Sequence, residues 1–218
     1  DPMITLATVP RWQRMTRGEM VATVKVIAYG VARTSVEAAS AAGANALRMR
    51  PVVMSRAALI QTVTDEDDGE RGHRAIQKRL EALSVVMQPK RVVPHRQADI
   101  AAALSGVTGA DLILILTASA TSDPQDVAPQ AVRQAGGRVD RFGMPVDPGN
   151  LLFLGRLGSV PVIGLPGCAK SPALNGADWV MERLICGVPV TGDDIAAMGV
   201  GGLLKEIPVR GRLREAPP

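Results

Sequence analysis

The stretch DLILILTASATSDPQDVAPQAV, residues 111–132, decides the fold of this chain. Its uninterrupted apolar run is typical of a strand buried on both faces of a parallel sheet. The run opens into a loop of Ala, Ser and Thr, after which a helix is expected. The same plan recurs about fifty residues later in VPVIGLPGCAKSPALNGADWV, residues 160–180. Loop N–H groups and the positive end of a following helix both favour anions. Two such junctions predict a cleft for a phosphate-bearing ligand along one edge of a sheet.

From Pro51 onward the sequence alternates between apolar strands and helical segments. The predicted strands are residues 58–64, 85–93, 111–117, 138–144, 150–155 and 161–165. The predicted helices are an amphipathic segment with Ile76, Leu80 and Leu83, then residues 98–106, 124–135 and 173–186. This alternation predicts an α/β fold, a three-layer, doubly wound and mostly parallel sheet covered by helices on both faces. Ligands of such sheets bind outside the carboxyl ends of the strands, where both loops fall.

The two ends of the chain differ from this middle part. Residues 1–50 are rich in β-formers, as in MITLATV and EMVATVKVIAYGV, and predict a small β-rich arm or subdomain. Residues 51–187 form the expected α/β domain. Residues 188–218 are rich in Gly and Pro and predict an extension or linker.

Composition excludes several classes of function. Aromatic residues make up only 2% of the 218 residues, so base stacking on aromatic side chains has almost no material. The net charge of +4 comes from scattered arginines, which argues against nucleic acid as a partner. Two cysteines form neither a disulfide framework nor a metal signature. No long apolar run or signal peptide is found, so we expect a cytoplasmic protein with no membrane partner.

The first loop offers carboxylates and hydroxyls. Asp123 is the expected N-cap with Pro124 at the first helical position, which puts Asp126 three residues after the cap. Asp126 has two interpretations: an acid that favours the helix dipole, or a carboxylate that holds a metal ion or activates a substrate group. Ser119 and Thr121 suit a phosphate or the polar edge of a pterin, although an ordinary hydroxyl turn is equally open.

The second loop offers a cation. Pro166 and Gly167 make a turn in which the backbone can approach a ligand. Ser171, followed by a proline, is the expected N-cap of the next helix. Lys170 then lies beside a helix start, an unfavourable place for a cation unless an anion binds there; an exposed surface lysine is the alternative. Cys168 is interpreted as an inert thiol.

These motifs resemble the molybdopterin-binding domain family of molybdenum-cofactor biosynthesis, in which molybdopterin molybdotransferases and adenylyltransferases are found. Its central motif has the form Gly-Gly-Thr-Gly-x-x-x-x-Asp-Val-Thr-Pro. Here Ala118 and Ser119 stand at the paired glycines, Thr121 at the hydroxyl or glycine position, and Asp126 to Pro129 at the helix start.

Two further segments carry the resemblance, which covers roughly residues 52–187. GMPVDPGNLLFLG is similar to the family's strand–Pro-Gly–strand segment through Pro148 and Gly149. LPGCAKS is similar to its Leu-Pro-Gly-Asn-Pro-x-Ser loop, and the matching residues are Leu165, Pro166, Gly167 and Ser171.

The chain also departs from the family pattern. The paired glycines are absent, and His95 stands where the family often has an acid. Asp147 and Asn150 replace two lysines, and Cys168-Ala169 replaces Asn-Pro. Binding of a molybdopterin-like ligand survives these changes more easily than adenylyl transfer or metal insertion.

The resemblance implies a protein that binds molybdopterin, or its adenylated or cytidylated form, as a transferase. The phosphate would lie between the first loop (Ala118, Ser119, Thr121, Ser122) and residues 167–171. Asp126 would be the catalytic residue and would hold Mg²⁺ or position the reacting group, while Lys170 would contact anionic oxygen. His95 would face the cleft and contact an anion or molybdate; a loop histidine with no role is the alternative.

The alternatives are a non-catalytic cofactor-binding or scaffold module and a nucleotide-processing hydrolase of the competence-damage type. The hydrolase needs an acidic cluster, and the run from Asp65 to Glu70 is interpreted instead as a solvated loop. The resemblance further implies a homo-oligomer and a fused or partner nucleotidyltransferase module.

Overall fold

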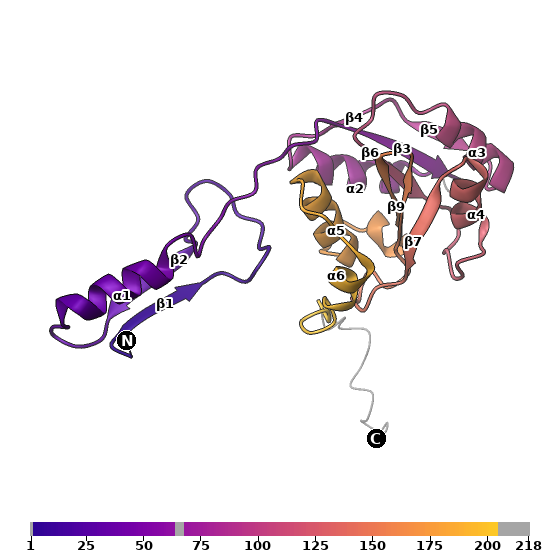
Figure 1. Ribbon diagram of the computed structural model, residues 1–218. Helices are drawn as coiled ribbons and strands as arrows, with labels where there is room; N and C mark the ends of the chain where they lie inside the picture. Colours follow the sequence, from indigo (N-terminus) through magenta and orange to yellow (C-terminus); the bar gives the residue numbers. More distant parts are fainter. Residues whose placement is uncertain (1, 64–67, 205–218) are drawn as a thin grey trace, which may run out of the picture. The chain divides into compact units, whose positions relative to one another are not determined.

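The computed structural model describes residues 2–63 and 68–204, which divide into two compact units, Asp1–Arg50 and Pro51–Pro218 (Figure 1). The division after Arg50 coincides with the change of sequence rhythm at Pro51. Residues 64–67, which include half of the acidic run at 65–70, and the end of the chain after residue 204 lie outside the described residues.

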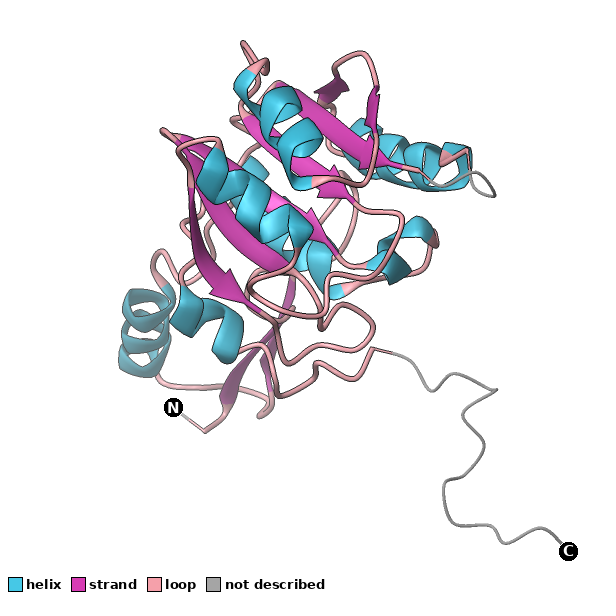
Figure 2. Ribbon diagram, turned by 90° about the vertical axis from the view of Figure 1, so that its right-hand side faces the viewer, coloured by secondary structure: helices cyan, strands magenta, loops and turns pink. Residues whose placement is uncertain are grey.

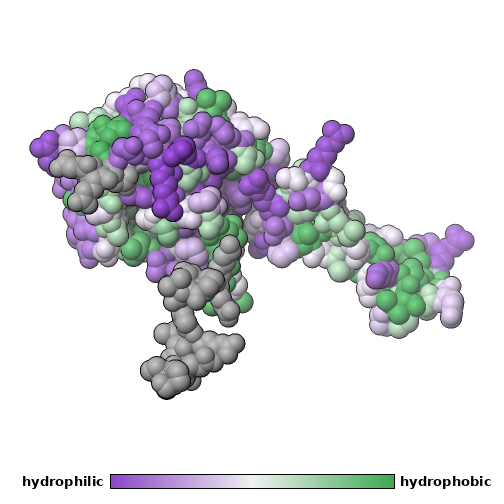
Figure 3. Space-filling model, turned by 180° about the vertical axis from the view of Figure 1, so that it is seen from behind, coloured by the Kyte–Doolittle hydropathy of each residue, from purple (hydrophilic) through white to green (hydrophobic). Residues whose placement is uncertain are grey.

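The first unit is a two-stranded hairpin followed by a helix. Strands β1 (Ile4–Thr8) and β2 (Ala22–Val26) pair antiparallel, and helix α1 (Arg33–Gly43) follows. The pairs Ile4–Val26 and Leu6–Val24 place apolar side chains on one face of the hairpin. No described residue of this unit is buried, and Figure 3 shows apolar surface on it. The predicted small β-rich arm is confirmed in the form of this hairpin.

The second unit is built on a seven-stranded sheet. Its strands are β3 (Arg56–Thr62), β4 (Val86–Met87), β5 (Arg91–Val93), β6 (Leu112–Leu116), β7 (Arg138–Phe142), β8 (Phe153–Leu157) and β9 (Val160–Leu165). Their order is β4-β3-β6-β9-β8-β7, and β5 also pairs with β3. The pairs among β3, β4, β5, β6 and β9 are parallel, whereas β8 runs antiparallel to both β7 and β9. The sheet is therefore mixed and mostly parallel.

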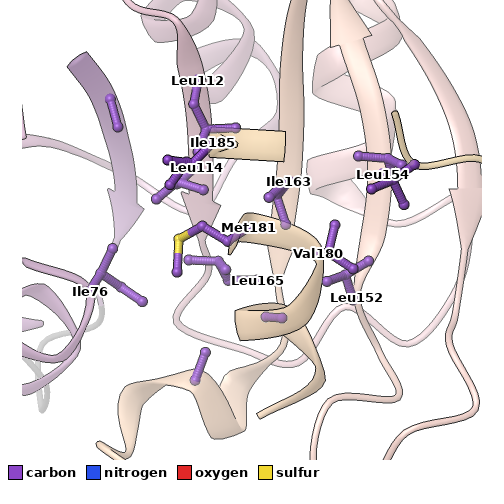
Figure 4. Close-up of a cluster of buried hydrophobic side chains, with 14 of the residues drawn as sticks. Ile76, Leu112, Leu114, Leu152, Leu154, Ile163, Leu165, Val180, Met181 and Ile185 are labelled. Atoms are coloured by element: carbon purple, nitrogen blue, oxygen red, sulfur yellow. The ribbon is translucent and has the colours of Figure 1, made fainter. Parts of the chain in front are cut away.

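Helices cover both faces of this sheet (Figure 2). They are α2 (Glu70–Glu81), α3 (Gln97–Ser105), α4 (Val127–Gln134), α5 (Gly176–Ile185) and α6 (Gly192–Ala196). Because side chains alternate along a strand, β6 presents Leu112, Leu114 and Leu116 to α2, α5 and α6, and it presents Ile113 and Ile115 to α3 and α4. Figure 4 shows the first of these cores. The predicted three-layer α/β architecture is confirmed.

Three predicted elements differ from the structure. The expected strand 85–93 is two short strands, β4 and β5, which pair with successive parts of β3. The helix expected from residue 124 begins at Val127, because the side chain of Asp126 bonds back to the N–H groups of Ser122 and Asp123 and Asp126 takes the N-cap position. The helix expected from residue 173 begins at Gly176, after a 3₁₀ turn, η1 (Gly167–Lys170).

Residues 188–204, expected as part of an extension or linker, pack with the second unit. Val190, Ile195 and Met198 are buried in the core that contains α2 and α5. The backbone of Asp147 also exchanges hydrogen bonds with Gly202 and Leu204. None of the helices in the described part of the chain is both long and apolar enough to cross a membrane.

Candidate functional site

Two loops leave the carboxyl ends of neighbouring parallel strands. The first loop, residues 117–126, follows β6, and the second loop, residues 166–175, follows β9. The last residues of the two strands, Leu116 and Leu165, are direct partners in the sheet. The loops therefore start side by side at one edge, as the sequence predicts.

Buried hydroxyl groups shape the start of the first loop. Thr117 donates its hydroxyl to the carbonyl oxygen of Ser119 at 2.6 Å. Its oxygen also lies 3.5 Å from the hydroxyl oxygen of Thr121, which is buried with it. The N–H of Ala118 donates to the hydroxyl oxygen of Thr62, the last residue of β3, at 2.7 Å. The loop is thus anchored to the neighbouring strand at its first turn.

His95 links this anchor to the exposed part of the first loop. Its Nδ1 lies 3.1 Å from the hydroxyl oxygen of Thr62, and its Nε2 lies 3.0 Å from the hydroxyl oxygen of Ser119. Because the oxygen of Thr62 already accepts from Ala118, its own proton is available for Nδ1. The neutral imidazole would then carry its proton on Nε2 and donate it to Ser119. The structure brings His95 and Ser119 together, while contact of His95 with an anion stays a prediction.

Asp126 stands at the N-cap position of helix α4, but its side chain bonds backward within the first loop and not to an N–H of the helix. It occupies the N-cap position expected for Asp123. Its Oδ2 accepts from the backbone N–H groups of Ser122 at 2.6 Å and Asp123 at 3.1 Å. In the described ranges, 2–63 and 68–204, no group of three or more His, Cys, Asp or Glu side chains gathers to hold a metal. The metal role of Asp126 stays a prediction.

The exposed part of the first loop differs from its neighbours in its backbone N–H groups. The backbone N–H groups of Ser119, Ala120 and Thr121 have no acceptor among the described residues, unlike those of their neighbours Ala118 and Ser122. Ser119 and Ala120 are exposed, so a ligand can approach their N–H groups, whereas Thr121 is buried. Successive N–H groups without acceptors are a common feature of anion sites in loops.

The second loop begins with the turn η1, which ends at Lys170. The ammonium group of Lys170 lies 3.5 Å from the carbonyl oxygen of Ala118 in the first loop. Its stem lies against α2, since a Cβ added to Gly72 would be 3.4 Å from the Cγ of Lys170. The predicted N-cap, Ser171, instead follows η1, and Asn175 caps α5. Lys170 is thus directed toward the first loop rather than placed at the start of the long helix.

Gly167 borders open space at the start of η1. A Cβ added there meets no atom within 4 Å, and its φ lies outside the left-handed region. The preceding Pro166 is buried, whereas Gly167 and Cys168 are exposed. The sulfur of Cys168 accepts from the side-chain amide of Asn175 at 3.0 Å. Packing does not require glycine at 167.

Pro148 and Gly149 lie against the start of α5. The N–H of Gly176 donates to the carbonyl oxygen of Pro148 at 2.8 Å. Gly149 has φ +140, and a Cβ there would come within 2.7 Å of the Gly176 nitrogen. This close approach explains the Pro-Gly pair structurally, and the contacts that the structure shows for it are with α5 rather than with the first loop.

Arg79 of α2 supports the second loop, a role that no sequence motif predicts. It pairs with Asp178 of α5 at 2.5 Å and donates to carbonyl oxygens of the loop. The sequence carries a local signal for its partner Asp178. Asn175 and Asp178 have the spacing of a capping box, in which Asp178 accepts from the N–H of Asn175 at 2.8 Å.

No known protein family and no curated protein matches this chain by sequence. Among solved structures, it is similar to the crystal structure of the molybdopterin biosynthesis MoeA protein from Pyrococcus horikosii. The two are 20% identical with a TM-score of 0.47, and the match covers 62% of this chain and 35% of the MoeA chain. The likeness is one of fold, and the chain spans about a third of that protein's length.

Proposed function

We propose that the chain binds molybdopterin, or a nucleotide derivative of it, with the ligand's phosphate between the first and second loops. The observation that carries the proposal is Lys170. Its ammonium group lies 3.5 Å from the Ala118 carbonyl oxygen, next to the three N–H groups of residues 119–121. A cation and successive N–H groups at one sheet edge form a suitable phosphate site.

Charge supports an anionic ligand. The Lys170 side chain is half-buried, so part of its hydration is lost. In this structure it donates to a neutral carbonyl oxygen of the first loop. A phosphate oxygen is a stronger acceptor for an ammonium group than a neutral carbonyl is, since charge-assisted hydrogen bonds are about twice as strong as neutral ones. A phosphate beside Ala118 would therefore receive a charge-assisted hydrogen bond from Lys170, in addition to the contacts that Lys170 already makes.

The choice of molybdopterin rests on the sequence resemblance. Three motifs occur in the family's order: the first loop, the Pro148-Gly149 segment and the second loop. Two of them border the proposed phosphate position, and the third fits against α5, which follows the second loop. A homo-oligomer and a fused or partner nucleotidyltransferase module belong to this proposal on the same ground, whereas a cytoplasmic location stays a prediction.

A non-catalytic binding module is the second candidate, and Asp126 favours it. The Oδ2 of Asp126 is bound to two N–H groups of its own loop. An acid that holds its loop closed has less freedom to take part in a transfer step. The N–H groups and Lys170 are unaffected by this, so binding without turnover remains compatible with the site.

The test is titration calorimetry with molybdopterin and its adenylated and cytidylated forms, using wild type, Gly167→Val and Gly30→Val. Gly167 and Gly30 both border open space with an ordinary φ, so valine should leave the melting temperature unchanged in both. We expect micromolar binding by the wild type and a loss of at least about tenfold for Gly167→Val alone, because its side chain would occupy the ligand's space.

Each outcome decides a different point. Absence of binding by a folded wild-type protein would overturn the proposal. Equal binding by wild type and Gly167→Val would place the ligand away from the second loop. Binding with Mg²⁺-dependent turnover would favour the transferase over the non-catalytic module, and turnover would then be lost in Asp126→Asn.

A further inference from the structure

Arg79 makes the largest set of polar contacts around the second loop. It lies on α2, and its side chain is only 11% exposed. The guanidinium group reaches the carboxylate of Asp178 and four carbonyl oxygens, three of them in the second loop. Removing a guanidinium charge from water is unfavourable unless such partners replace the water. We therefore expect these contacts of Arg79 to hold the groups that it binds in place.

Two of these contacts lie on either side of Lys170. Arg79 donates from Nη1 to the carbonyl oxygen of Ala169 at 3.1 Å and from Nη2 to that of Ser171 at 2.8 Å. These carbonyl groups belong to the residues directly before and after Lys170 in the sequence. Fixing both of them fixes the position and direction from which the Lys170 side chain leaves the backbone.

The remaining contacts tie the same group to α5. Arg79 donates from Nη2 to the carbonyl oxygen of Ala173 at 2.9 Å and from Nε to Asp178 at 2.5 Å. Asp178 in turn accepts from the N–H of Asn175, the N-cap of α5. Arg79 therefore holds the second loop along most of its length, from η1 to the first turn of α5.

We infer that Arg79 is a positioning residue that aims Lys170 at the ligand, an inference that rests on the proposed function. Arg79 does not itself contact the proposed phosphate position. It acts through the backbone on both sides of Lys170. The stem of Lys170 lies against Gly72, which belongs to the same helix as Arg79. Helix α2 thus supports both the backbone and the side chain of Lys170.

The planar shape of guanidinium makes this inference testable by a conservative change. Arginine offers five N–H donors in a rigid fork, whereas lysine offers a compact charge on a flexible stem. Lysine at position 79 can keep the pair with Asp178, yet it cannot reach Ala169, Ser171 and Ala173 together. Arg79→Lys should therefore keep the fold and loosen the second loop.

The experiment is a double-mutant cycle on the dissociation constant of the tightest-binding molybdopterin form. It compares wild type, Arg79→Lys, Lys170→Ala and the double variant, with the exposed Arg74→Lys on the same helix as control. We expect Arg79→Lys and Lys170→Ala each to weaken binding about tenfold, and the double variant to bind no more weakly than Lys170→Ala. Independent, additive losses would overturn the inference, because a merely structural role would not depend on Lys170.

Hydrogen exchange of the ligand-free protein separates this inference from the proposed function. Arg79→Lys should raise amide exchange in residues 167–175 and leave residues 117–126 unchanged. If the wild type binds none of the ligands, the proposed function fails, and the exchange data still decide the role of Arg79. Unchanged exchange in the second loop would overturn the inference in either case.

Discussion

The first and second loops leave adjacent strands at the same sheet edge, yet they are held by different chemistry. Neutral hydroxyl groups and the imidazole of His95 hold the first loop, and its own Asp126 closes it. A buried ion pair between Arg79 and Asp178 holds the second loop. For the proposed phosphate, we therefore infer that the first loop supplies N–H groups and that the second loop supplies the cation of Lys170, whose backbone is held in place.

The largest expected effect comes from removing the cation that holds the second loop. Arg79→Met leaves the carboxylate of Asp178, only 10% exposed, without its partner. Breaking a buried ion pair from one side costs about 3–5 kcal/mol, which lowers the melting temperature of a unit of this size by roughly 10 °C. Arg74→Met, on an exposed face of the same helix, should change stability little.

Fluorescence of Trp179 reports the thermal unfolding of the second structural unit, to which Arg79 and Asp178 belong. Trp179 lies in α5, and the other tryptophan, Trp12, can be replaced by phenylalanine in all variants. If Arg79→Met melts within a few degrees of its parent, the pair with Asp178 does not stabilise the second loop, and the two loops differ less than their contacts indicate.

A smaller effect is expected at the anchor of the first loop. Thr62→Val keeps the shape of a side chain that is 2% exposed, but it leaves the N–H of Ala118 and the Nδ1 of His95 without a partner. We expect a loss of about 1–2 kcal/mol, less than for Arg79→Met, because the lost bonds are neutral. Urea unfolding followed by Trp179 fluorescence provides the comparison.

Thr62→Ser is the matched control for this change. Serine keeps the hydroxyl group, so it should retain the bond to Ala118 and most of the stability. Should valine and serine prove equally stable, the hydroxyl of Thr62 would not be what anchors the first loop.

Substitutions of Asp126 test whether its carboxylate holds the first loop closed. Asp126→Ala removes the acceptor for the loop N–H groups of Ser122 and Asp123 and should cost about 1 kcal/mol. Asp126→Asn keeps one acceptor oxygen and should cost less. Thermal unfolding measures both, and hydrogen exchange should rise in residues 117–126 but not in 166–175. A rise in both loops would mean that they are coupled through Lys170 and Ala118.

The sequence predicted those parts of the site whose physics is local. A run of five buried aliphatic residues in β6 and the apolar end of β9 indicate central parallel strands from composition alone. The small and hydroxyl residues that follow indicate loops at their carboxyl ends. Sheet, layers and the placement of both loops could therefore be predicted.

Two details could not be predicted. One depends on competition between two possible N-cap residues, and the other on contacts between residues far apart in the sequence. Asp123 and Asp126 are both good caps, and the sequence alone does not show that Asp126 bends back to bind the N–H groups of residues 122 and 123. Arg79 stands 99 residues before Asp178 and 90 before Ala169. Within an amphipathic helix rich in charges it has no pattern of its own, so its role emerges only from the packing of α2 on the second loop.

The smallest effect is expected at Asp111, which lies at the amino end of β6, opposite both loops. Its Oδ2 accepts from the N–H of Ser55 at 2.8 Å and from that of Arg56 at 2.9 Å. The N–H of Ser55, and after it that of Arg56, lowers the pKa of the Asp111 carboxyl below its ordinary value. Since the folded state then binds fewer protons than the unfolded state, Asp111 stabilises the fold above the ordinary aspartate pKa of about 4.

This contribution is lost as the pH falls through the lower pKa of the folded state. Asp111→Asn should therefore reduce stability by less than about 1 kcal/mol at pH 7, since solvent screens the carboxylate, and the difference from wild type should shrink below pH 4. Chemical unfolding between pH 3 and pH 7 measures it. Because Asp111 holds the edge away from the loops, hydrogen exchange in residues 117–126 and 166–175 should stay unchanged. Faster exchange in either loop would show that the strands transmit changes from one sheet edge to the other, and the contrast between the loops would then depend on the whole sheet.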